Sequence, residues 1–196
     1  MADPASGPAC RMALKEWATV LEAIARGEQL LLIRKGGLIE PGSGFELMAE
    51  QFLFYPTFEH QAVNYLREPY RRYFDEALTR RAPEGRVRFG LAGTAVSSVR
   101  TQDATLVSRL GDFHIYNEAF LHQRLKWQPE QTLVLILLRA FQLPRPQEMP
   151  VAPHYAGCKS WVELATPLSL IGARPVLEDR VFQERADAIR AILNES

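Results

Sequence analysis

The sequence predicts a single α+β domain built on a mixed, curved sheet. Its 196 residues, of which 47% are hydrophobic, suit one domain with a substantial core. Helix-like and strand-like segments are interspersed without regular alternation, which argues against a doubly wound parallel sheet. We place the domain at residues 12–196 and expect residues 1–11, which are rich in Pro, Gly and Ser, to form a disordered tail.

The N-terminal half predicts two helices with a strand between them. Apolar residues recur every three or four positions from Met12, and Gly27 is placed to end that helix. A strand is expected over residues 29–35. A longer helix is expected from about residue 59 to residue 81, and Pro69 should kink or split it because proline removes a backbone donor.

Further strands are expected on either side of the second helix. Residues 45–55 predict one strand or two, and residues 87–99, which are rich in Val, Ala, Gly, Ser and Thr, predict one or two more. Gly90 and Gly93 indicate a bulge or a close approach of the backbone within that segment. A short strand is expected at residues 113–116.

The C-terminal half begins with a short helix, for which Asn117 is a suitable N-cap and Trp127 the expected end. Residues 132–143 are the clearest central strand. Four prolines then predict a long loop over residues 144–153. An amphipathic helix is expected over residues 177–193.

Composition excludes some functional classes. The 23 basic and 23 acidic residues give no net charge, so no global field attracts nucleic acid or a membrane. No apolar run approaches the roughly 20 residues of a membrane span, and no signal-peptide pattern is present. Cys10 and Cys158 lie in unrelated settings, which favours reduced thiols. We therefore expect a soluble cytoplasmic protein without a membrane partner.

The first candidate site follows an apolar run at residues 30–33. Arg34 and Lys35 come directly after it, and Gly36 and Gly37 follow them. Two cations beside exposed glycine amides at a strand end suit an anion such as phosphate. The alternative is a tight turn that needs positive φ, with both side chains in solvent.

A second polar run follows the apolar residues 52–55. Here Glu59 is expected to orient His60, while His60 and Gln61 contact an anionic ligand. A direct acid–base pair is awkward, because neighbouring residues point in different directions. The alternative is a simple helix start with Thr57 as the N-cap.

Metal-dependent catalysis has little support in the sequence. The histidines are scattered, no zinc-type spacing occurs, and we expect no metal and no cofactor. A restriction-type nuclease needs Glu-x-Lys on a strand, which none of Glu40, Glu46 and Glu50 provides. Cys158 lies beside Lys159, yet no histidine is placed to act as its base, so a tight turn is favoured over a nucleophile.

A third candidate is a nucleic-acid surface. Residues 67–88 contain seven arginines against four acidic residues. The arginines alternate with aromatic residues, a combination that suits phosphate contact and base stacking; the set is Arg67, Arg71, Arg72, Arg80, Arg81, Arg86 and Arg88 with Tyr65, Tyr70, Tyr73 and Phe89. Arg124 and Lys126 add a smaller patch beside Trp127. The alternative is a solvated helix face above a buried aromatic stripe.

Several separated segments together resemble one known family. They are Met12-Ala-Leu-Lys-Glu-Trp, Leu32-Ile-Arg-Lys-Gly-Gly, Phe54-Tyr-Pro-Thr-Phe-Glu-His-Gln, Arg124-Leu-Lys-Trp, Leu138-Arg and Tyr155-Ala-Gly-Cys-Lys-Ser-Trp. In this order, from Met12 to about Leu193, they are similar to the bacterial domain-of-unknown-function family numbered 1802. The resemblance implies a prokaryotic protein of a family of unknown function, associated with restriction–modification-type nuclease domains. It assigns no catalytic residue.

These observations lead to one main hypothesis. By analogy with PUA/ASCH-like folds, the curved sheet is expected to form a small barrel, and the protein a non-catalytic module that binds nucleic acid or a nucleotide. The hypothesis requires Arg34, Glu59, His60 and Lys159 to meet in one pocket. One alternative is a metal-dependent hydrolase or nuclease relative using Glu40, Glu59 and His60. Another is a non-catalytic partner of a restriction-type nuclease in a DNA-processing complex.

Overall fold

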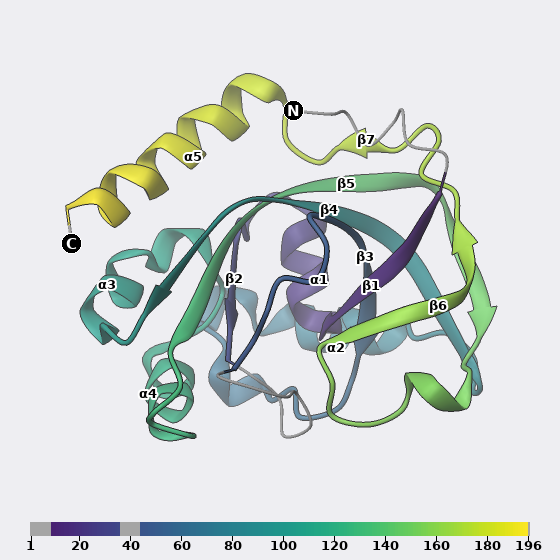
Figure 1. Cartoon of the computed structure of the whole chain (residues 1–196), viewed down its shortest axis with the longest axis horizontal. Helices are drawn as coiled ribbons and strands as arrows, with labels where there is room; N and C mark the ends of the chain where they lie inside the picture. Colours follow the sequence, from purple (N-terminus) through teal and green to yellow (C-terminus); the bar gives the residue numbers. More distant parts are fainter. Residues whose placement is uncertain (1–8, 36–43, 196) are drawn as a thin grey trace.

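A computed structural model of the chain describes residues 9–35 and 44–195. Its described part contains one seven-stranded sheet with helices packed around it (Figure 1). The strands are β1 (Cys10–Trp17), β2 (Leu31–Arg34), β3 (Gln51–Thr57), β4 (Arg86–Thr101), β5 (Leu133–Pro150), β6 (Trp161–Leu168) and β7 (Arg174–Pro175). Their order is β2-β5-β4-β3-β1-β6, and β7 pairs with β5. Only β1 and β3 pair in parallel in the described sheet. The predicted α+β fold with a mixed sheet is confirmed.

The α-helices of the described part are α1 (Ala18–Ala25), α2 (Arg72–Thr79), α3 (Ala104–Arg109), α4 (Glu118–Lys126) and α5 (Asp179–Asn194). The predicted cap of α4 is confirmed, since the Asn117 side chain accepts a hydrogen bond from the Phe120 amide at 3.1 Å. The amphipathic C-terminal helix is confirmed as α5, which buries Phe182, Ala186 and Ile189.

The helix expected from Met12 is wrong. Those residues form β1, and the helix begins only at Ala18. Because β1 lies inside the sheet between β3 and β6, both of its faces are buried, and Ala13 and Leu14 are equally inaccessible. A strand buried on both faces does not alternate between polar and apolar residues. The apolar residues of this segment therefore recur at a spacing that also fits a helix. The strand begins at Cys10, within the range assigned to the tail; residues 1–8 lie outside the described part.

The long helix expected over residues 59–81 is also wrong in extent. Only α2 forms there, after two short 3₁₀ turns, and Pro69 lies in the second of these. His60 has a φ of +60°, which no helix accommodates. The expected helix start at Thr57, Glu59 and His60 is therefore absent.

Strand β5 continues through the region expected to be a long loop. Between the pairs Leu91↔Gln142 and Phe89↔Gln147, four residues of β5 lie opposite one residue of β4. Pro144 lies within this wide bulge, where the ladder requires no donor from it. The prolines therefore distort the strand without ending it.

Successive residues of the central strands contribute to two different cores. Leu14 and Phe54 point into a core shared with the α-helices, while Ala13, Leu53 and Tyr55 point into a second core with β6. The sheet thus carries buried side chains on both faces. Because both faces of the sheet are buried, the alternation of side chains along each strand decides on which side of the sheet a polar side chain at the strand end lies.

A glycine in β4 makes room for two aromatic rings of the neighbouring strand β3. A Cβ atom at Gly93 would lie 2.9 Å from Cε2 of Phe54 and 3.0 Å from Cε2 of Phe52, which confirms the predicted close approach. We expect Gly93→Ala to lower the free energy of unfolding by about 1–3 kcal/mol through overpacking, as measured by urea denaturation. Gly111→Ala is the matched control, because nothing lies within 4 Å of its added atom. Equal losses in both variants would contradict the packing argument.

Candidate functional site

A large cavity in the described part lies where the sheet divides. The β3–β4 ladder covers only Gln51–Leu53 and Ala92–Thr94. Beyond it, β3 remains paired with β1, while β4 remains paired with β5. Between the two strands lies a cavity of about 1170 Å³. Pro56, in the half of β3 without a ladder to β4, is suited to that position because it has no amide hydrogen to pair.

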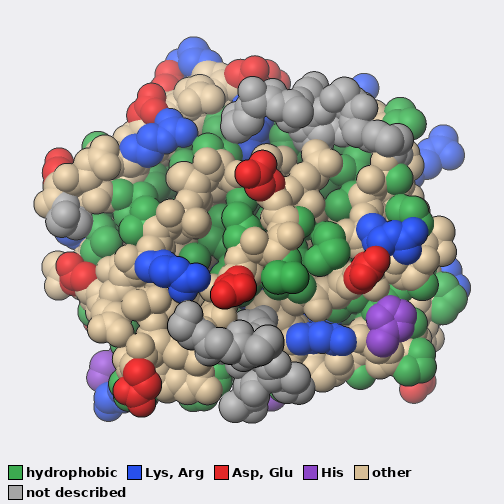
Figure 2. Space-filling model, viewed as in Figure 1, with side chains coloured by type: hydrophobic (Ala, Val, Ile, Leu, Met, Phe, Trp, Pro, Cys, Tyr) green, Lys and Arg blue, Asp and Glu red, His purple; other side chains and the backbone are tan. Residues whose placement is uncertain are grey.

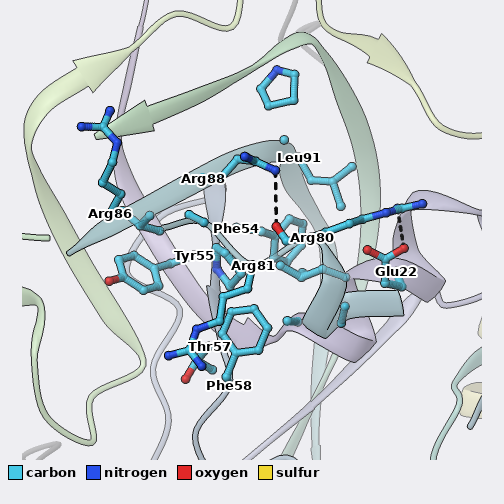
Figure 3. Close-up of a pocket in the computed structure, with 18 of the residues that line it drawn as sticks. Glu22, Phe54, Tyr55, Thr57, Phe58, Arg80, Arg81, Arg86, Arg88 and Leu91 are labelled. Carbon is cyan, nitrogen blue, oxygen red and sulfur yellow. Dashed lines mark hydrogen bonds and ion pairs between the residues drawn. The ribbon is translucent and has the colours of Figure 1, made fainter. Parts of the chain in front are cut away.

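Four arginines line this cavity, which we call the arginine groove (Figure 3). Arg80 and Arg81 come from the segment that links α2 to β4, and Arg86 and Arg88 from the start of β4. Helices α1 and α2, the C-terminal half of β3 and strand β5 also contribute lining residues. The acidic side chains among the lining residues are Glu22, Glu59 and Glu84. Four guanidinium groups and three carboxylates thus line the groove, and a fourth carboxylate, that of Glu148, pairs with two of the arginines.

Three of the four arginines are held by ion pairs. Arg80 binds Glu22 of α1 at 2.6 Å, which fastens the linking segment over the groove. Arg86 and Arg88 share Glu148 of β5 at 3.2 and 2.7 Å, and these two arginines lower the pKa of the Glu148 carboxyl. Ion pairs thus orient three of the four guanidinium groups of the groove.

Arg81 differs from the other three. Its guanidinium lies 4.9 Å from the centroid of the Phe58 ring and forms no ion pair with any described residue. Phe58 is half-buried and lines the groove at the end of β3, beside Thr57 in Figure 3. An exposed arginine–aromatic pair of this kind can stack on a planar base while the guanidinium contacts phosphate.

The groove contains only part of the arginine-rich surface expected from sequence. Arg67, Arg71 and Arg72 do not line it. Tyr73 is fully buried and donates a hydrogen bond to Glu28 at 2.6 Å. Sequence reasoning missed Phe58, although its position after an apolar strand was a signal for it.

A second polar cluster, which we call the buried ion cluster, joins β1, β2 and α4. Arg34 donates to the Glu16 carboxylate at 3.1 Å and to Ser160 Oγ at 2.8 Å. Arg124 lies close enough to Arg34 that burial and this second cation both lower the Arg124 pKa. Tyr116 is buried in the same place, and its pKa is raised well above the ordinary value by burial and by Glu16. The cluster therefore contains two guanidinium groups and one carboxylate.

Lys35 has a structural partner. Its ammonium donates to the carbonyl oxygens of Arg124 at 2.8 Å and Leu125 at 3.3 Å, in the last turn of α4. A cation here satisfies helix carbonyls that lack an intrahelical donor. Lys35 is only 5% exposed, and burial lowers its pKa. The expectation that Arg34 and Lys35 could point into solvent is wrong.

The predicted site residues do not gather in one place: some lie in the buried ion cluster or at the arginine groove, and others lie in neither. Arg34 belongs to the buried ion cluster and Glu59 lines the arginine groove. His60 is exposed, and Gln61 accepts a hydrogen bond from Thr19 Oγ1 at 3.1 Å. Lys126 is exposed at the end of α4. Gly36, Gly37 and Glu40 lie outside the described residues.

Lys15, which the sequence did not point to as a site residue, lies between the buried ion cluster and the arginine groove. Lys15 of β1 donates to the Gly157 carbonyl at 3.0 Å, and its backbone amide donates to Ser160. Its pKa is lowered first by burial; Glu59 acts in the opposite direction and Lys159 in the same direction. Lys15 was overlooked because its segment was interpreted as a helix.

Metal and thiol chemistry have no assembled site in the described residues. Over the ranges 9–35 and 44–195, no three His, Cys, Asp or Glu side chains are grouped to hold a metal ion. Cys158 is exposed and follows Gly157, whose φ of +89° makes the tight turn favoured from sequence.

The family model described as "Domain of unknown function (DUF1802)" matches residues 13–188. The chain belongs to this family. The resemblance inferred from the six sequence segments is confirmed. The association of this DUF1802 protein with restriction–modification nucleases stays a prediction, since no curated protein matches the chain.

Solved structures similar to the DUF1802 chain include ASCH from Zymomonas mobilis. That structure is 12% identical, with a TM-score of 0.44, and the match covers 90% of this chain and 93% of the other. Two mutant forms of the same protein match at 13% identity and a TM-score of 0.43. One match covers 79% of this chain and 90% of the other, and the second covers 93% and 99%.

The surface of the DUF1802 protein is mixed in charge on the face shown in Figure 2. Basic and acidic side chains are interspersed there, with apolar surface between them. In the described part, no helix combines the length and apolar character that crossing a membrane requires.

Proposed function

We propose that this DUF1802 protein binds single-stranded nucleic acid in the arginine groove. The observation that carries the proposal is the Arg81–Phe58 pair at the wall of a groove lined by four arginines. The groove's volume of about 1170 Å³ exceeds the roughly 300–1,000 Å³ of pockets for small ligands. An extended ligand fits this space better than a compact metabolite.

The chemistry of the lining matches the two parts of a nucleotide chain. Guanidinium groups bind phosphate oxygens, and each neutralised phosphate releases bound counterions. The half-buried ring of Phe58 can stack on a base, and bases stack on aromatic side chains irrespective of sequence. The lining residues lie between two β-strands of one sheet. A single nucleic-acid strand can therefore enter the groove, whereas a base-paired duplex would contact only its rim.

Fluorescence anisotropy with a labelled oligonucleotide tests the proposal. We expect single-stranded RNA or DNA to bind more tightly than the corresponding duplex, with an affinity that falls as salt is raised. Phe58→Ala should weaken binding by about 1–3 kcal/mol, the usual effect of losing one stacked base. Arg81→Ala should weaken binding and reduce the salt dependence by about one phosphate contact.

Arg180→Ala is the matched control for Arg81→Ala. Arg180 is exposed on α5, where it pairs with Glu184 within the same helix and does not line the groove. The control should bind like the unmodified protein. Absence of binding at low salt, or equal weakening by both arginine variants, would refute the proposal.

A further inference from the structure

The ammonium groups of Lys15 and Lys159 have only carbonyl oxygens as hydrogen-bond partners in the described structure. Lys15 donates to the Gly157 carbonyl at 3.0 Å, and Lys159 donates to the His154 carbonyl. Neither lysine forms an ion pair with a described residue. We refer to these residues as the lysine pair. An ammonium group has three donors, so each lysine retains donors for a ligand.

The backbone fixes the lysine pair in one place. The Lys15 amide donates to the Ser160 carbonyl at 2.8 Å, which fastens β1 to the loop that carries Lys159. Within that loop the Lys159 amide donates to Gly157 at 3.0 Å, and the positive φ of Gly157 makes the turn possible. The two cations therefore come from elements that are hydrogen-bonded to each other.

The lysine pair is connected to the groove through β3. Lys15 is the register partner of Tyr55, and its Nζ lies 5.6 Å from the centroid of the Tyr55 ring. Tyr55 and Glu59 both line the groove. Burial lowers the Lys15 pKa and Lys159 adds to that effect, while Glu59 opposes it. Both ammonium groups are cations carried by hydrogen-bonded elements, so an anion bound by both would offset their like charge.

We propose that Lys15 and Lys159 bind the terminal phosphate monoester of a strand lying in the groove. This inference rests on the proposed function. It specifies the chemical state of the end of the bound nucleic-acid strand. A terminal monoester carries a charge of about −1.5 to −2 at pH 7, which matches two ammonium groups. An internal phosphodiester carries a single charge and suits the individual arginines of the groove.

The test compares one oligonucleotide in three forms: 5′-phosphorylated, 3′-phosphorylated and without a terminal phosphate. We expect one phosphorylated form to bind about tenfold more tightly than the unphosphorylated form, the order of one charge-assisted hydrogen bond. Lys159→Ala and Lys15→Met should each remove this preference while leaving the affinity for the unphosphorylated strand nearly unchanged. Lys15→Arg, which keeps the charge, should retain the preference.

Lys126→Ala serves as the matched control, because Lys126 is exposed on α4, which contributes nothing to the groove. Thermal unfolding of each variant checks that Lys15→Met leaves the fold intact; Lys159, in a loop, provides the independent variant. Equal affinity for all three oligonucleotides would overturn the inference and leave the groove proposal standing. Binding of inorganic phosphate that depends on Lys159, without binding of any oligonucleotide, would instead overturn the groove proposal and retain a phosphate site.

Discussion

Replacing Glu16 with alanine is expected to destabilise the protein by about 3–5 kcal/mol, the usual cost of leaving a buried charge without its partner. Glu16 is 4% exposed and is the carboxylate of the buried ion cluster. It accepts hydrogen bonds from Arg34 at 3.1 Å and from the Trp17 amide at 2.7 Å. Its removal would leave the guanidinium groups of Arg34 and Arg124 close together without a negative charge between them.

Urea or thermal unfolding measures this effect. The control is Glu163→Ala in β6, because Glu163 is exposed and only 4.0 Å from Arg11, an ion pair expected to contribute at most about 1 kcal/mol. An equal, small loss of stability in both variants would show that the Glu16 carboxylate does not stabilise the two guanidinium groups of the cluster. A loss confined to Glu16→Ala supports a structural role for Arg34, separate from ligand binding.

Lowering the pH from about 7 to 4 is expected to reduce the stability of the protein through His114. This histidine is 2% exposed, and its pKa is lowered to about 4, mainly by burial and further by Arg67. Its Nδ1 accepts a hydrogen bond from the Tyr116 amide at 3.2 Å, which a protonated ring cannot do. The folded state therefore favours the neutral imidazole.

The direction of the pH effect follows from this preference. An unfolded histidine binds a proton near pH 6.5, whereas the folded one does so only near pH 4. The stabilisation is complete above pH 6.5 and is lost as the pH falls towards 4, by roughly 3 kcal/mol in all. Urea unfolding at several pH values measures it. His114→Gln should flatten the curve over this range, and an unchanged curve would contradict the role of His114. The exposed His122 provides the control substitution.

Local sequence patterns predicted much of this fold. The capping asparagine at residue 117, the amphipathic stripe of α5 and the apolar run of β2 each act within a few residues, so they can be read without knowing the rest of the chain. Strand β1 could not be identified in this way. Its identity depends on β3 and β6, which are distant in sequence and bury both of its faces.

The sequence predicted which residue types form the candidate site but not how they are arranged. Arg80, Arg81, Arg86 and Arg88 were identified from composition, but the divergence of β3 and β4 that brings them to Phe58 is a property of strand pairing. The expected meeting of Arg34, Glu59, His60 and Lys159 assumed that every strand end faces the same pocket. Burial of Arg34 against Glu16 shows why charge at a strand end is not by itself evidence of exposure.

The prolines of β5 have a further consequence. From residue 143 to residue 150, no strand of the described structure pairs with β5 on the side opposite β4. Pro144, Pro146 and Pro150 cannot donate backbone hydrogen bonds along this free border. A strand from a second molecule would find few donors to pair with there. The same residues that bend β5 therefore disfavour edge-to-edge pairing with a second chain.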